Sequence, residues 1–320
     1  MTRFDSRRRV STYTSVWMPT GDETVNPVAG YFGGGYDGSA ISGIDKISFT
    51  DDTKSTLSAT LTSARYRLAG MANSGVAGYF GGGNDGSHLS GIDKITFPAD
   101  TKSTLSATLT SARSLLAGMA NSGTAGYFGG GTDGANISGI DKITFSADTK
   151  STLSATLTTA RNQLAGMANS GTAGYFGGGV GSAGNISGID KITFADDSKS
   201  TLSATLTSAR YGLAGMANSA VAGYFGGGHD NINYFSGIDK ITFSADTKST
   251  LSATLTSGRY HLAGMANSGT AGYFGGGFDD TTRFSGIDKI TFSADTKSTL
   301  SATLSSGRYV LAGFADSGTL

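Results

Sequence analysis

Short apolar stretches alternate with polar, glycine-rich turns along the whole chain, and this pattern is strongly periodic. The string AGYFGGG begins at residues 29, 77, 125, 173, 222 and 271, so successive copies are 48 or 49 residues apart. The excess of glycine, 50 of 320 residues, follows the same period and therefore indicates repeated turns. No apolar period near 3.6 residues occurs, so the pattern predicts an all-β protein.

The third repeat illustrates the elements that each unit predicts. Residues 116–121 form a small, apolar strand, and residues 125–131 form a second strand that ends in glycines. Residues 140–145 are β-branched and predict a third strand. A polar turn follows at 146–150, and residues 152–157 alternate Leu and Ala with Ser and Thr, as expected of an outer strand with one wet face.

Six such units predict a six-bladed β-propeller of four-stranded blades over residues 29–320. The repeats start near residues 30, 78, 126, 174, 223 and 272. The first AGYFGGG strand has no LAG strand before it, so the C-terminal strand at 311–315 is expected to join the N-terminal blade. Closure removes sheet edges that an open array would expose. Exchange of this strand between chains is the alternative, because repeats this similar can swap.

The six copies differ mainly after GYFGGG and after the Arg that precedes each LAG strand. Because strand direction alternates within a blade, both variable sets are expected on one face of the propeller. Aromatic and Arg side chains carry much of the energy at binding interfaces, so this rim is the candidate binding site; drift at exposed loops is the alternative. Its candidates are Tyr36, Tyr66, Arg67, His88, Tyr211, His229, Tyr234, Phe235, Tyr260, His261, Phe278, Arg283, Phe284 and Tyr309.

Composition and motifs favour binding over chemistry. Lys and Arg number 24, as do Asp and Glu, which argues against a nucleic-acid partner, and no apolar run is long enough for membrane insertion. The chain has no Cys, and its three His lie in loops of different units without metal-ligand spacing. One Asp recurs per blade, from Asp45 to Asp288, and is expected to have a backbone amide or Lys as its structural partner. No enzymatic activity, cofactor or metal is therefore predicted.

Residues 1–28 lie outside the repeat and form a predicted N-terminal arm. Its basic start holds Arg3, Arg7, Arg8 and Arg9, and Trp17 is the only Trp of the chain. A basic start without an apolar core does not predict a secretory signal. The arm is either a frayed tail or a docking segment that orders on a partner.

The unit resembles the kelch repeat, in which a blade carries a strand ending in Gly-Gly and an Arg before the next blade. The matching positions include Gly33-Gly34 and Gly81-Gly82, and the matching arginines are Arg65, Arg113, Arg161, Arg210, Arg259 and Arg308. Leu57, Leu105 and their equivalents stand where the kelch outer strand has Trp. The resemblance covers residues 29–320 and implies a propeller.

The string YFGGG-x-D-G…IDKITFS-x-DT…LTSAR-x-x-LAGMANS also resembles repeats in virion structural proteins of tailed phages, notably cyanophages. That resemblance implies a tail fibre or other surface component, assembled in the host cytoplasm as part of an oligomeric virion. The arm would dock on other virion proteins, and the rim would bind a host surface glycan or protein. A purely structural capsid or tail decoration protein, and a lectin-like module of the bacterial cytoplasm or cell surface, are the alternatives.

Overall fold

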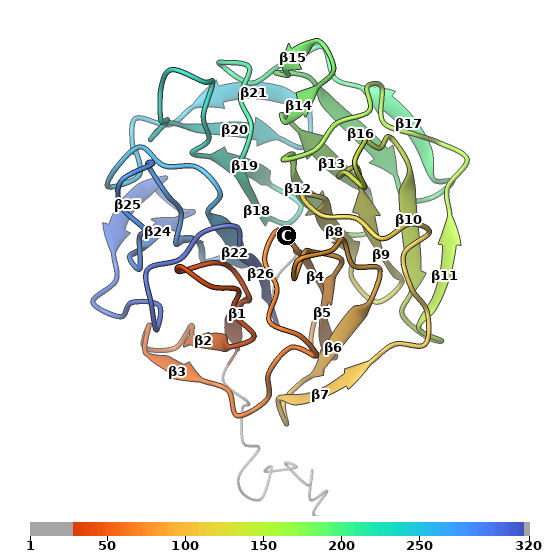
Figure 1. Ribbon diagram of the computed structural model, residues 1–320. Coiled ribbons are helices and arrows are strands. Elements are labelled where there is room, and N and C mark those ends of the chain that lie inside the picture. The colour runs from red at the N-terminus through yellow and green to blue at the C-terminus, as the bar shows by residue number, and fades with distance from the viewer. Residues whose placement is uncertain (1–27, 317–320) are drawn as a thin grey trace, which may run out of the picture.

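A computed structural model describes residues 28–316 as six four-stranded antiparallel sheets arranged around a central axis (Figure 1). The predicted six-bladed β-propeller is therefore confirmed. Within the described range the chain forms strands and turns without a helix, and so without any helix that could span a membrane.

Blade 3 shows the plan, running outward from the axis through β8 (Ala117–Asn121), β9 (Ala125–Gly129), β10 (Ile140–Thr144) and β11 (Thr149–Thr152). Blade 2 comprises β4 (Ala69–Asn73), β5 (Ala77–Gly81), β6 (Ile92–Thr96) and β7 (Thr101–Thr104). Blade 4 comprises β12 (Ala165–Asn169), β13 (Ala173–Gly177), β16 (Ile189–Thr193) and β17 (Ser198–Thr201), with the hairpin β14 (Val180–Gly181) and β15 (Gly184–Asn185) in its loop. Blade 5 comprises β18 (Ala214–Asn218), β19 (Ala222–Gly226), β20 (Ile238–Thr242) and β21 (Thr247–Thr250). Blade 6 comprises β22 (Ala263–Asn267), β23 (Ala271–Gly275), β24 (Ile287–Thr291) and β25 (Thr296–Thr299).

Blade 1 is closed by the far end of the chain. It comprises β1 (Ala29–Gly33), β2 (Ile44–Ser48), β3 (Lys54–Thr56) and the innermost strand β26 (Ala312–Ala315). β26 pairs antiparallel with β1, Tyr31 lying opposite Phe314. The predicted closure is thus confirmed within one chain, and no blade is left without its inner strand.

The outer strand lies earlier than the sequence predicts. In blade 3 it is β11 (Thr149–Thr152), which begins in the segment expected to be a turn and ends where the outer strand was expected to begin, whereas residues 153–157 run on as a connection. Leu157 is buried, and the next residue, Thr158, donates its backbone N–H to Asp190 of blade 4 at 2.9 Å. The alternation of apolar side chains there reflects packing of this connection, which is why it imitates a strand.

Adjacent blades interlock through glycine and phenylalanine. A Cβ on Gly81 would lie 2.5 Å from the ring of Phe128 in the next blade, so the ring occupies the place of the missing side chain. At the axis a Cβ on Gly118 would lie 2.1 Å from the carbonyl oxygen of Gly70. The inner strands therefore pack backbone against backbone, which only glycine permits.

A buried ion pair fastens each connection to the following blade. Arg113 and Asp141 are 2% and 1% exposed and lie 2.9 Å apart, and Thr110 donates its backbone N–H to the same carboxylate. Lys150 lies 3.9 Å from that carboxylate. The recurring Asp thus has the backbone-amide and Lys partners that the sequence predicts, and a buried Arg in addition. A carboxylate satisfied in this way in every blade belongs to the scaffold.

Candidate functional site

The two variable sets of residues meet on one face of the propeller, as the alternation of strands predicts. In each blade the residue after the connecting Arg forms an isolated β-bridge with the residue after GYFGGG. Tyr260 pairs with Phe278 in blade 6, and Ser114 pairs with Thr132 in blade 3. We call this side of the molecule the variable face.

Nine of the predicted rim residues form a continuous aromatic arc across blades 5, 6, 1 and 2. Tyr260 lies near its centre, 4.3 Å from His261 and 5.3 Å from His229 between ring centroids. Tyr309 stacks on Phe278 at 4.7 Å, and Tyr36 continues the arc toward blade 2. The aromatic arc comprises Tyr36, Tyr66, Tyr211, His229, Tyr234, Tyr260, His261, Phe278 and Tyr309.

Blades 3 and 4 carry small side chains at the equivalent positions. Ser114 pairs with Thr132, and Asn162 pairs with Val180. Asn162 also donates its side-chain amide to Asn136 at 2.6 Å. We call these four paired positions the small-residue sector. The aromatic side chains are therefore concentrated on one part of a scaffold that is otherwise repeated.

The connections close into a ring of backbone hydrogen bonds at the axis. The N–H of Leu115 donates to the carbonyl of Arg67 at 2.8 Å, and the N–H of Arg67 donates to the carbonyl of Val310 at 2.7 Å. The same bond recurs around the ring, whose members are Arg67, Leu115, Gln163, Gly212, His261 and Val310. All six have positive φ, between 49° and 63°. The ring consumes one N–H and one C=O of every member, so recognition at the axis depends on side chains.

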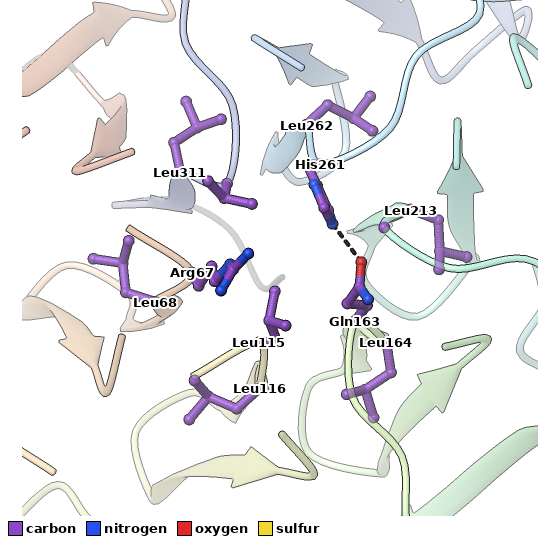
Figure 2. Close-up of a pocket in the computed structure, with 12 residues that line it drawn as sticks. Arg67, Leu68, Leu115, Leu116, Gln163, Leu164, Leu213, His261, Leu262 and Leu311 are labelled. Atoms are coloured by element: carbon purple, nitrogen blue, oxygen red, sulfur yellow. Dashed lines mark hydrogen bonds between the residues drawn. The ribbon is translucent and has the colours of Figure 1, made fainter. Parts of the chain in front are cut away.

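A small cavity of about 70 Å³ lies inside this ring, and leucines that include Leu116 and Leu262 line it (Figure 2). Arg67, Gln163 and His261 are its polar lining residues. The Nε2 of His261 lies 2.5 Å from the Oε1 of Gln163. The bond passes over Gly212, where a Cβ would lie 2.7 Å from the His261 ring. Glycine at this position therefore makes room for the histidine.

The remaining rim candidates have other places. Phe235 and Phe284 lie under the guanidinium groups of the buried Arg210 and Arg259, at 5.5 and 5.4 Å, and so pack on the scaffold. Arg283 is exposed and lies over Tyr36 and Phe278 at 5.9 and 6.0 Å. His88 bridges to Asn84 in blade 2 and has no ring contact within residues 28–316. The docking-arm candidates Arg3, Arg7, Arg8, Arg9 and Trp17 lie outside the described residues.

The electrostatics of the variable face favour fixed protonation states. A hydrogen bond to Asp280 raises the pKa of Tyr234 to about 12, and burial together with Asp280 raises the pKa of Tyr260. The hydrogen bond from Tyr234 helps to lower the pKa of Asp280. Burial, and then the charge of Arg67, lower the pKa of His261 to about 3. Because general acid–base catalysis works best with a pKa near the working pH, these groups are better suited to hydrogen bonding than to proton transfer.

Two contributors to this face were missed in the sequence. Gln163 occupies the same position after the repeated Arg as Arg67 and His261, so comparison of the repeats could have identified it. Asp280 accepts hydrogen bonds from Tyr234 and Tyr260, 46 and 20 residues away, which no local pattern indicates. Among residues 28–316 no group of three or more His, Cys, Asp or Glu side chains is placed to hold a metal ion.

No protein-family model matches the chain, and no curated protein matches it either.

Proposed function

We propose that the protein is a non-enzymatic recognition module that binds its target with the aromatic arc. The observation that supports this proposal is the unequal distribution of aromatic residues over six blades that share one backbone plan. Partly buried tyrosines lose little conformational freedom on binding and offer both apolar area and a hydroxyl group. Such residues commonly dominate binding energy.

The setting that we propose is the surface of a tailed-phage virion, as a tail fibre or related component that contacts a host receptor or a neighbouring virion protein. The support for this setting is the resemblance of the repeat to those of virion structural proteins. Genes for capsid and tail proteins beside its own gene are the expected observation. A neighbourhood of unrelated metabolic genes would count against the virion setting while leaving the recognition role untouched.

The test of the recognition role uses the protein's own repeats as a guide. A variant with Tyr260→Ser and Tyr309→Ser copies the residue that blade 3 has at this position, Ser114, so the backbone should be retained. Binding of the full chain to a glycan array and to immobilised bacterial cells is then measured. We expect at least a tenfold loss, since truncation of a central aromatic residue costs on the order of 2 kcal/mol or more.

The matched control lies at the turns between the first two strands of blades 2 and 5. Val76 and Val221 are exposed there, where blades 3, 4 and 6 have Thr124, Thr172 and Thr270. A Val76→Thr and Val221→Thr variant should bind as the unmodified protein does. If this control loses binding and the tyrosine variant does not, a decoration role through the unvaried face replaces recognition by the aromatic arc.

A further inference from the structure

The cavity inside the axial ring combines a cation with apolar walls. Arg67, Gln163 and His261 supply its polar side chains, and leucines, Val310 and Gly212 complete its lining (Figure 2). The volume of about 70 Å³ exceeds the roughly 10–15 Å³ that a cavity needs to hold one water molecule, so a small functional group fits.

Arg67 is the charged member of this lining, and within residues 28–316 it forms no ion pair. Its Nε atom is buried and has no hydrogen-bond partner among the described residues. Its guanidinium carbon lies 5.2 Å from the ring centre of Tyr66, which belongs to the aromatic arc. An anion beside Arg67 would give this buried Nε donor an acceptor, and an unsatisfied buried donor is costly.

The other polar side chains of the cavity are hydrogen-bonded to each other. Gln163 and His261 bond to each other, so their relative orientation is fixed. The backbone N–H groups of the ring are consumed by its own hydrogen bonds. Arg67 therefore supplies the recognition of charge, and its planar fork of N–H donors matches the two oxygens of a carboxylate.

The surroundings of the cavity indicate what carries the carboxylate. His261 is both a lining residue and a member of the aromatic arc, and Tyr260 and Tyr309 lie beside it. A sugar ring presents apolar C–H faces to aromatic rings and hydroxyl groups to polar side chains. The phenol groups of Tyr234 and Tyr260 and the Asp280 carboxylate supply such polar partners.

We propose that the axial cavity binds the carboxylate of an acidic sugar residue through Arg67, while the sugar ring rests on the aromatic arc. This inference rests on the proposed recognition function and specifies its ligand class. Acidic sugars should bind more tightly than the corresponding neutral sugars, since only the acidic ones pair with the guanidinium.

The experiment is an NMR titration of the full chain with glucuronate and glucose, and with galacturonate and galactose. We expect each acidic sugar to bind at least about tenfold more tightly than its neutral counterpart, as charge-assisted hydrogen bonds are among the strong ones. Acetate and a short peptide with a free C-terminal carboxylate serve as further probes. Tighter binding of the peptide than of glucuronate would overturn the assignment to a sugar.

The decisive variant is Arg67→Leu, because the same ring position holds Leu115 in blade 3 with φ of 58°, against 60° for Arg67. The fold should therefore be retained, and the preference for acidic over neutral sugars should disappear. Arg67→Lys is the matched control, since it keeps the positive charge at the same ring position but lacks the planar fork of N–H donors. Full preference for acidic sugars in Arg67→Lys would indicate general charge attraction and would overturn the carboxylate assignment.

The two proposals fail differently. If Tyr260→Ser with Tyr309→Ser abolishes target binding and Arg67→Leu leaves acidic-sugar preference unchanged, the recognition function stands and the carboxylate site is wrong. If neither variant weakens binding of any probe, both proposals are wrong.

Discussion

The aromatic arc and the small-residue sector share one backbone and differ in their side chains. Tyr260 and Phe278 form the same bridge in blade 6 that Ser114 and Thr132 form in blade 3. In the axial ring, His261 and Leu115 have φ of 56° and 58°. The backbone of the variable face thus has the same conformation whether its side chains are aromatic or small.

The backbone does not depend on the variable side chains for a structural reason. The buried Arg–Asp pairs and the interlocking of glycine with phenylalanine recur around the ring, away from the variable positions. Stability is supplied by these repeated contacts, so the variable positions are free to differ. The comparison teaches that scaffold and recognition surface are separate sets of residues in each repeat.

The largest loss of stability is expected from removing a buried ion pair of the scaffold, which recurs in the blades of both regions. Asp141→Ala in blade 3 and Asp288→Ala in blade 6 each leave a buried Arg without its carboxylate. Each should lower the free energy of unfolding by about 3 to 5 kcal/mol, measured by urea denaturation. The control Asp51→Ala, at an exposed turn, should change it far less. A clear difference between the two buried variants would break the equivalence of the two regions.

The second-largest loss of stability is expected at low pH. Burial of Asp45 opposes its ionisation, but hydrogen bonds from Ser305 and the charge of Arg308 outweigh burial and lower its pKa below the ordinary value of 3.8. The carboxylates of Asp93, Asp239 and Asp288 shift in the same direction. The unfolded chain therefore takes up protons first, and stability present above about pH 4 should fall as the pH drops further. Denaturation curves that stay unchanged from about pH 5 to about pH 2 would contradict this.

A smaller loss of stability is expected when a residue of the aromatic arc is replaced by the small residue of the other region. Tyr309→Ser removes a ring that stacks on Phe278 and contacts Tyr36. It should cost about 1 to 2 kcal/mol, since each aromatic pair contributes about 0.5 to 1.5 kcal/mol beyond its buried area. Thermal unfolding of this variant should remain a single transition, which would show that the two regions still unfold as one unit. A loss as large as that from Asp288→Ala would mean that the aromatic arc is part of the scaffold.

The smallest effect concerns one phenol of the aromatic arc. Asp280→Asn removes the charge that holds the Tyr234 proton, so the pKa of Tyr234 should fall from about 12 toward its ordinary value of 10.0. The change is measured as phenolate absorbance in an alkaline titration, with the unmodified protein as reference. Identical titration curves would show that Asp280 does not organise this part of the variable face.

Much of the fold follows from the repeat itself. Six copies of a β-rich unit with an unpaired strand at each end determine the blade number and the closure of β26 on β1. The outer strand was misplaced, because the period-two alternation of Leu153, Ala155 and Leu157 comes from packing of a connection and not from the sheet. Local pattern cannot separate these two causes of alternation.

The sequence by itself determined the architecture and which positions vary. Positions that are identical among the six copies define the blade, and positions that differ define the variable set. Only the tertiary structure decided which variable residues meet. Gln163 and His261 are 98 residues apart and touch across the glycine of an intervening blade. Ring closure brings Arg67 of blade 2 to the same cavity. The physical reason is that a closed ring places residues at equal repeat positions around one axis, whatever their separation along the chain.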